Sequence, residues 1–384
     1  MKAFYIFLFL VSTAATAQEK RLRLVFAGDI MAHQSQLNAA RRQDGRYDFS
    51  ESLVYIQDVL REAHLAAGNL ELTFAAKPPY AGYPTFRTPG EFATALRKAG
   101  FNLLLAANNH ANDGSAEGVA YTIKVLDENH FYYTGTFANP LEKEARYPLI
   151  IYKNGFKLAV LNYTYGLNAP HIRPPVVINQ MVEAEMEKDI DTARRMQPDA
   201  IILILHWGEE YTDTPTENQR QLARRLVEWG ADMVIGAHPH VVQPIEWIDN
   251  SRGESKLVAY SLGNFSSGMR LPGTEGGILL AAELKKEDRE VHLDSCHFIP
   301  IWCYPGRDKT GRRTHHVLPA AAYEENAGAP FALPAWRLRQ LKSFTRQTRQ
   351  LLQDSGCPER KVSLPEAKKE EQHDRFRNSS GRPE

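Results

Sequence analysis

Residues 232–240 read DMVIGAHPH, and they combine the two features on which the fold prediction rests. The apolar run over 232–235 predicts a buried strand, and Gly236 then frees the backbone before His238 and His240. Two imidazoles placed two residues apart after a strand end can bind one transition metal ion, or one each of two neighbouring ions. The same pair could equally be solvated histidines in a turn. Which interpretation is favoured depends on whether similar stretches occur elsewhere in the chain.

Other apolar runs in the chain end in the same way, with a polar residue directly after the predicted strand. These runs are 23–27, 64–67, 101–107 and 199–205. The polar residues after all five strands are Asp29, Asn69, Glu71, Asn109, His110, His206, His238 and His240. Taken alone, Asp29 would be interpreted as a helix N-cap or a turn former.

Strands alternate with helical segments over residues 21–285, which predicts an α/β fold. Because the carboxyl ends of parallel strands meet at one edge of a sheet, these polar side chains can converge although they are far apart in sequence. All of them offer oxygen or nitrogen and none is a cysteine. Such a set suits a divalent ion such as Mn²⁺, Fe²⁺ or Zn²⁺, one or two in number.

The length of 384 residues, with 43% hydrophobic and 24% charged residues, is typical of a globular protein with a sizeable core. Lys and Arg together number 46, as do Asp and Glu, and the formal net charge is zero. This balance, without a long basic run, argues against a nucleic-acid-binding protein.

The N-terminus reads MKAFYIFLFLVSTAATA, with a basic start, a short apolar core and an Ala-x-Ala site. This pattern predicts a secretory signal peptide over 1–17, cleaved near Ala17-Gln18, and an exported protein of the periplasm or cell envelope. An uncleaved N-terminal anchor is the alternative. Three cysteines are present. Either Cys296 and Cys303 pair across a bend, leaving Cys357 free, or all three are buried and inert.

Further elements complete the predicted organisation. Residues 50–63 have helical spacing with Ser50 as the N-cap, and the strands end near residue 301. We predict a main domain over 21–305 and an extension over 306–354. Within the extension, 335–352 forms a basic amphipathic helix that either packs on the core or docks on a membrane or partner. The charged residues 355–384 are predicted to be disordered.

The sequence resembles a known family through a series of motifs that follow one another in order from about residue 22 to 285. The motifs are GDIM at 28–31, NLE at 69–71, NNH at 108–110 with Asp113 and Gly114, HWGEEY at 206–211, GAHPHVVQ at 236–243 and YSLGNF at 260–265. They resemble the CapA (PgsA-type) poly-gamma-glutamate capsule-synthesis family, which is similar to the calcineurin-like metallophosphoesterases. The resemblance implies a four-layer α/β/β/α sandwich with a two-metal site at the sheet edge.

When the family's roles are assigned residue by residue to this sequence, the resemblance implies a role for each motif. Metal ligands would be Asp29, Asn69 or Glu71, Asn109, His206, His238 and His240. His110 would contact the substrate as the general acid beside Asn109. Arg87, which could hold an anionic substrate or be an ordinary surface residue, joins Glu210, Gln243 and Asn264 as the substrate-binding candidates.

Two positions depart from the metallophosphoesterase pattern. Its first motif is Asp-x-His, but the third residue here is Met31, and His33 is either a substitute ligand or a surface residue. No Asp stands where the family places a bridging carboxylate, although Glu71 and Asn69 are close by. The site could therefore bind one metal, two, or none.

Three functions are compatible with these observations. The first is a metal-dependent hydrolase or transferase that acts on an exported anionic polymer such as poly-gamma-glutamate. The second is a non-catalytic accessory or assembly subunit that works beside a membrane synthase. The third is a general phosphoesterase, which the missing Asp-x-His motif disfavours. Metal-dependent turnover separates the first from the second.

Overall fold

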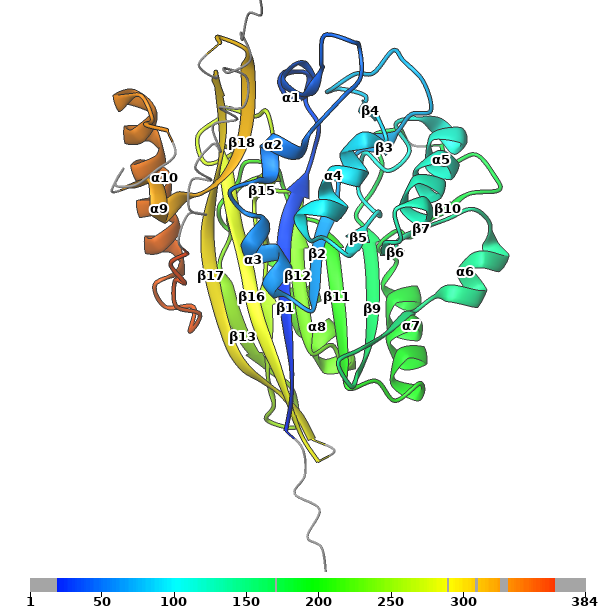
Figure 1. The fold of residues 1–384 in the computed structure, drawn as a ribbon. Coiled ribbons are helices and arrows are strands. Elements are labelled where there is room, and N and C mark those ends of the chain that lie inside the picture. Colours follow the sequence, from blue (N-terminus) through cyan, green and yellow to red (C-terminus); the bar gives the residue numbers. More distant parts are fainter. Residues whose placement is uncertain (1–18, 170, 289, 308–309, 325–330, 363–384) are drawn as a thin grey trace, which may run out of the picture.

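Two β-sheets face each other in the computed structural model, which describes residues 19–169, 171–288, 290–307, 310–324 and 331–362 (Figure 1). The larger sheet has the strand order β18-β17-β16-β1-β2-β5-β6, and β15 also pairs with β1. Its strands are β1 (Lys20–Ile30), β2 (Leu65–Leu70), β5 (Leu103–Leu105), β6 (Tyr132–Thr134), β15 (Asn264–Ser266), β16 (Gly276–Glu287), β17 (Glu290–Arg307) and β18 (Arg313–Pro319).

The smaller sheet has the strand order β13-β14-β12-β11-β9-β8. Its strands are β8 (Leu149–Lys153), β9 (Phe156–Thr164), β11 (Ala200–His206), β12 (Met233–Ala237), β13 (Ile245–Asp249) and β14 (Ser255–Ala259). Two short ribbons lie outside the sheets: β3 (Thr73–Phe74) with β4 (Arg87–Thr88), and β7 (Thr136–Phe137) with β10 (Val177–Ile178).

Helices cover the outer face of each sheet. Those next to the larger sheet are α1 (Gln34–Ala40), α2 (Ser50–Leu53), α3 (Gln57–Glu62), α4 (Glu91–Ala99) and α5 (Ser115–Glu128). Those next to the smaller sheet are α7 (Glu183–Arg195) and α8 (Glu217–Trp229), while α6 (Pro140–Arg146) lies at the periphery. Three apolar clusters separate these layers, and the middle one lies between the sheets. The predicted four-layer α/β/β/α sandwich is confirmed.

Parallel pairing places the ends of the central strands at one edge. Strands β11 and β12 are buried along their whole length and pair in parallel, with His206 opposite Ala237. In the larger sheet β1 pairs in parallel with β2, and Asp29 is opposite Asn69. Strand β1 runs upward in Figure 1, so the candidate site lies at the upper end of the molecule.

The predicted single helix over 50–63 is wrong, because the chain forms two short helices, α2 and α3. Ser50 is also not the N-cap. The Asp48 carboxylate accepts hydrogen bonds from the Ser50 backbone N–H at 2.9 Å and from its hydroxyl at 2.6 Å. The apolar residues Leu53, Ile56, Val59 and Leu60 of this segment are nevertheless all buried in the core.

The predicted domain boundary at 305 falls inside β17, which pairs with the unpredicted strand β18. Helix α9 (Ala320–Glu324) follows. Helix α10 (Ala335–Leu352) lies beside β17 (Figure 1) and buries Leu341 and Phe344. The prediction that α10 packs on the core is therefore confirmed.

The cysteine pairing differs from the prediction. Cys296 forms a disulfide with Cys357, and Cys303 is a buried free thiol. Cys296 and Cys303 lie seven residues apart on the one continuous strand β17, roughly 23 Å at the rise of a β-strand, so they cannot pair. The disulfide also corrects the predicted disorder of 355–362, which is ordered against the sheet; residues 363–384 lie outside the described residues.

A Cys296→Ser/Cys357→Ser variant is expected to be less stable by roughly 2–4 kcal/mol, because the link joins residues 61 apart and restricts the unfolded chain. Urea unfolding followed by circular dichroism measures the loss. The Cys303→Ser variant, which removes a thiol but no covalent link, is the control and should lose less. Equal midpoints for the wild type and the double variant would contradict a stabilising role.

No helix among residues 19–362, as far as they are described, has the length and apolar character needed to span a membrane. The predicted signal peptide over residues 1–17 lies outside the described residues.

Candidate metal centre

Two glycines allow the strand ends to meet the loop that follows β14. A Cβ atom on Gly28 would lie 1.8 Å from the carbonyl oxygen of Gly263, and one on Gly236 would lie 1.8 Å from that of Tyr260. Only glycine permits such an approach. The segment 260–264 therefore packs against the ends of β1 and β12, one in each sheet, and joins the two halves of the site.

Asp29 lies at the centre of the resulting cluster and is fully buried. Its Oδ1 accepts a hydrogen bond from Asn69 Nδ2 at 2.8 Å, and its Oδ2 lies 3.1 Å from His240 Nδ1. The backbone N–H of His238 also donates to Oδ2, at 3.2 Å. Asp29 therefore connects β1, β2 and the H-x-H loop, as its position after β1 predicted.

Glu71 connects two groups of potential metal ligands. Glu71, His238 and His240 each present a ligand atom within 4.8 Å of one another, and so do Asp29, Glu71 and His206. Glu71 Oε1 lies 3.7 Å from His206 Nε2 and 3.8 Å from His240 Nε2. Because the two groups share only Glu71, its carboxylate would be the bridging ligand if each group held an ion.

The donor atoms fit a divalent cation. Both carboxylate oxygens of Glu71, Nδ1 of His238 and Oδ1 of Asn69 are buried without a hydrogen-bond partner. Leaving such groups unpaired costs free energy, since a buried polar atom has lost its water. The only charged partners within ion-pair distance of Asp29 and Glu71, among the residues that the structure describes, are histidines. A bound cation would satisfy all of these atoms.

Burial shifts the pKa values of Glu71, His206 and His238 toward their uncharged forms. Burial, and next the neighbouring Asp29 carboxylate, raise the pKa of Glu71 well above its usual value. Burial, with the nearby His238, lowers the pKa of His206 well below its usual value. Burial, with the nearby His240, lowers the pKa of His238 to about 3. Both of these imidazoles are therefore neutral and keep a lone pair for a metal ion.

His238 and His240 both have a left-handed backbone, with φ values of 100° and 61°. Such backbone conformations are unfavourable for residues other than glycine and are held where the surroundings require them. Nδ1 of His240 lies 3.1 Å from Asp29 Oδ2 and 3.1 Å from Asn264 Oδ1, so it carries the proton. Its Nε2, on the side of Glu71 and Glu210, is left free as a ligand atom.

His110 is held by three contacts beside this cluster. Its Nδ1 lies 2.7 Å from Asp113 Oδ2, and its Nε2 lies 3.2 Å from Asn168 Nδ2. The Phe86 ring lies edge-on to the imidazole, 4.7 Å between centroids. Asp113 also accepts the Phe86 backbone N–H at 2.7 Å, which fixes the carboxylate. This arrangement places the proton on Nδ1 and leaves Nε2 as the atom that can exchange one.

Asn109 contacts the cluster through His206, whose Nε2 lies 3.0 Å from Asn109 Oδ1. The structure therefore brings together all the sequence-predicted metal ligands: Asp29, Asn69, Glu71, Asn109, His206, His238 and His240. The structure also shows where the residues that depart from the Asp-x-His motif lie. Met31 packs into the apolar core, and His33 Nδ1 accepts the backbone N–H of Gly268 at 3.1 Å.

The predicted substrate-binding residues divide into three groups. Glu210 is 40% exposed and lies 3.8 Å from His240, at the opening of the site. Asn264 is fully buried, and its Oδ1 orients His240. Gln243 is buried as well, with its amide donating to the Thr212 carbonyl at 2.7 Å, and Arg87 donates to the Pro79 carbonyl. For Asn264, Gln243 and Arg87 these contacts do not test the substrate-binding role, which stays a prediction.

Three exposed tyrosines border the cluster, and the sequence analysis missed them. Tyr83, Tyr165 and Tyr211 are 70%, 48% and 47% exposed. Their rings lie 6.2 Å from His110, 4.5 Å from His238 and 6.1 Å from His240, respectively. They come from three separate loops, so no periodicity could reveal them, although Tyr211 ends the HWGEEY motif. They offer aromatic faces to whatever enters the site.

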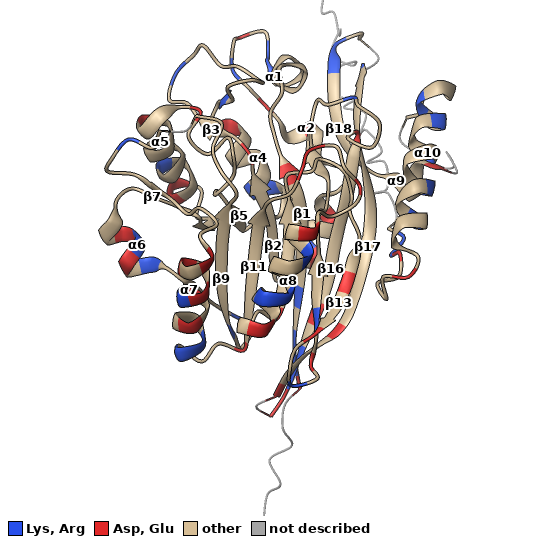
Figure 2. Ribbon diagram, turned by 180° about the vertical axis from the view of Figure 1, so that it is seen from behind, with Lys and Arg blue, Asp and Glu red and all other residues tan. Residues whose placement is uncertain are grey.

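Charge is mixed over the outside of the smaller sheet. Figure 2 shows acidic and basic residues side by side on α6 and α7, in keeping with the formal net charge of zero. Helix α10 differs, since its sequence contains Lys and Arg but no Asp or Glu.

Comparisons with known proteins agree with the motifs. The family model "Bacterial capsule synthesis protein PGA_cap" matches residues 23–269. The capsule biosynthesis protein CapA of Bacillus anthracis is 28% identical over 266 residues, which are 65% of this chain and 60% of that protein. The PGA biosynthesis protein CapA of Bacillus subtilis (strain 168) is 28% identical over 280 residues, 71% of this chain and 70% of that protein.

Among solved structures, the calcineurin-like phosphoesterase YfkN from Bacillus subtilis is similar, with a TM-score of 0.44 and 12% identity. That similarity covers 87% of this chain and 98% of the solved chain.

Proposed function

The chain belongs to the family of bacterial capsule synthesis proteins of the PGA_cap type, and from this we propose that it is an exported, metal-dependent hydrolase or transferase of capsule or envelope polymer biosynthesis. The observation that carries the proposal is the pair of buried ligand groups that share Glu71. A carboxylate so deeply buried, without a protein cation beside it, is retained at a cost that a bound metal ion removes.

The proposed substrate is an anionic polymer of the poly-gamma-glutamate type. The support is the relative from Bacillus subtilis, whose name describes it as a PGA biosynthesis protein. Export is supported by the sequence of residues 1–17 alone. The chain spans about 60% of the Bacillus anthracis relative, so the polymer and its partners are proposals for this chain.

Asp29, Glu71, His206, His238 and His240 would hold one or two ions of Mn²⁺, Fe²⁺ or Zn²⁺, with Asn69 and Asn109 beside them. Such ions activate water and neutralise negative charge on the reacting group. His110 exchanges a proton at Nε2 with the leaving group, while Asp113 holds Nδ1 protonated and the ring in place. Glu210 lies at the opening, where it meets an incoming substrate.

One observation favours a second function. Met31 replaces the histidine of the Asp-x-His motif and packs into the core, so the site has one candidate ligand fewer than the metallophosphoesterase pattern. In this alternative the chain is a non-catalytic accessory or assembly subunit of a membrane synthase. The same site would then bind polymer or stabilise the fold. The third possibility, a general phosphoesterase, is disfavoured by the same substitution.

Metal analysis of the chain purified without chelator tests the proposal. We expect one or two equivalents of Mn, Fe or Zn per wild-type chain and a loss of most of this metal in a His238→Ala/His240→Ala variant. The matched control is His292→Ala/His297→Ala, which removes two histidines of β17 and should keep the metal. A wild-type protein that stays metal-free after incubation with each ion would overturn the metal-dependent proposal and favour the accessory subunit.

A further inference from the structure

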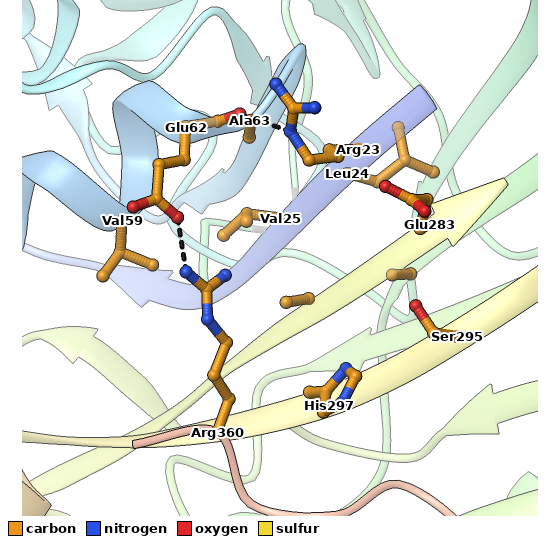
Figure 3. Close-up of a pocket in the computed structure, with 12 residues that line it drawn as sticks. Arg23, Leu24, Val25, Val59, Glu62, Ala63, Glu283, Ser295, His297 and Arg360 are labelled. Atoms are coloured by element: carbon orange, nitrogen blue, oxygen red, sulfur yellow. Dashed lines mark hydrogen bonds and ion pairs between the residues drawn. The ribbon is translucent and has the colours of Figure 1, made fainter. Parts of the chain in front are cut away.

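A separate pocket opens on the outer face of the larger sheet (Figure 3). Its volume is about 350 Å³. It is lined by residues of β1, α3, β16 and β17 and by Arg360 of the C-terminal segment. Arg23 in this pocket and Asp29 are six positions apart on β1, which is roughly 20 Å along an extended strand. A ligand here would therefore not contact the proposed metal ligands.

The C-terminal segment forms one side of the pocket and is firmly attached. The Phe298 backbone N–H donates to the Pro358 carbonyl at 3.1 Å, and the Arg360 N–H donates to the Phe298 carbonyl at 2.8 Å. The disulfide of Cys296 with Cys357 lies directly beside these bonds. The pocket is thus built by the fold rather than left by a loose chain end.

Four charged side chains line the pocket, and three of them form ion pairs. Arg360 pairs with Glu62, as the dashed line in Figure 3 shows, and Glu283 pairs with Arg21. Arg23 forms no ion pair with any described residue; its Nε donates to the backbone carbonyl of Glu62 at 2.9 Å. Among these four, Arg23 is therefore the side chain without an ion pair, and its guanidinium can pair with a ligand that carries a single negative charge.

The rest of the lining is suited to a small organic molecule. Val25, Val59 and Ala281 give an apolar surface. Ser295 and His297 face the same space in Figure 3, and within the described parts of the chain their side chains have no hydrogen-bond partner. Apolar walls with a few convergent polar groups are typical of small-molecule sites, and 350 Å³ is at the small end of their range.

We propose that this pocket binds a small organic carboxylate with a compact apolar body. Arg23 pairs with the carboxylate, Ser295 and His297 donate hydrogen bonds to it or to a neighbouring polar atom, and Val25, Val59 and Ala281 contact the apolar part. A planar guanidinium matches the two oxygens of a carboxylate in geometry as well as in charge.

Benzoate and benzyl alcohol are suitable probes, because they share a compact ring and differ in charge. Ligand-observed NMR titration of the purified chain is expected to show saturable millimolar binding of benzoate and at least tenfold weaker binding of benzyl alcohol. An Arg23→Gln variant should weaken benzoate binding by about tenfold. The matched control is Arg61→Gln, since exposed Arg61 also donates to a backbone carbonyl, that of Lys98, but lies outside the pocket.

A second variant tests the pocket by filling it. Ala281→Leu places a larger apolar side chain in the space and should abolish benzoate binding, while thermal unfolding reports whether each variant is folded. Metal content should be unchanged in both pocket variants, so this outcome does not depend on the proposed metal centre. Benzoate binding that is absent from the wild type, or that is equal in the wild type, Arg23→Gln and Ala281→Leu proteins, would overturn the proposal.

Discussion

A Glu71→Gln variant is expected to lose bound metal by roughly a hundredfold or more in affinity, and with it all metal-dependent turnover. Residues that only support metal ligands typically cost 10–100-fold when changed, and Glu71 belongs to both ligand groups directly. Glutamine keeps the shape of the side chain but replaces one anionic oxygen by an NH₂ group, which cannot bind a cation. Titration of metal into protein that has been stripped of metal with a chelator measures the change in affinity.

The same variant should change stability in opposite directions with and without metal. In the metal-free protein Glu71→Gln removes a buried carboxylate next to Asp29, so the variant should be at least as stable as the wild type. With metal bound, the wild type should be the more stable protein, because the ion binds its folded state more tightly. The control is Glu210→Gln, a half-exposed carboxylate at the opening, which should retain the metal. Unchanged metal affinity in Glu71→Gln would contradict the bridging position.

A His110→Asn variant is expected to lose about 10²–10⁴-fold in kcat, the usual range for a general acid or base, while its metal content stays unchanged. His110 contacts Asp113, Asn168 and Phe86 but belongs to neither ligand group. Its effect should therefore fall on the proton transfer and not on metal binding. Steady-state kinetics of the metal-loaded protein on polyglutamate and on phosphoesters measures the loss.

Asp113→Asn serves as the matched variant for this position. An amide in place of the Asp113 carboxylate no longer fixes the proton on Nδ1 of His110, so kcat should fall. The Phe86 N–H loses a charged acceptor as well. Any resulting loss of stability would be measured by thermal unfolding, separately from the kinetics. Wild-type turnover in both variants would exclude His110 as the group that transfers the proton.

Much of the candidate site followed from local sequence. Runs such as 200–205 are apolar throughout, as expected for parallel strands covered on both faces. The polar residue at the end of such a strand has to lie at the edge of the sheet, since the side chains before it are buried in the core. Asp29, His206 and the His238/His240 pair were placed correctly for this reason.

Three of the predicted substrate-binding residues have contacts that the local sequence did not indicate. Gln243 lies only three residues after His240, but its amide bonds to the Thr212 carbonyl and does not face the site. Arg87 follows a Pro-rich loop, and its guanidinium donates to Pro79 within that loop. Asn264 belongs to the site as predicted, but β15 places it behind His240, where it orients the imidazole.

The sequence by itself determined the strand–helix alternation and the kind of side chain at each strand end, because both depend on periodicity and on local backbone preference. The tertiary structure alone decided that Glu71 is shared by two ligand groups, and that Cys296 pairs with Cys357 and not with Cys303. These outcomes depend on distances between segments that meet only when both sheets are packed, and no local pattern encodes such distances.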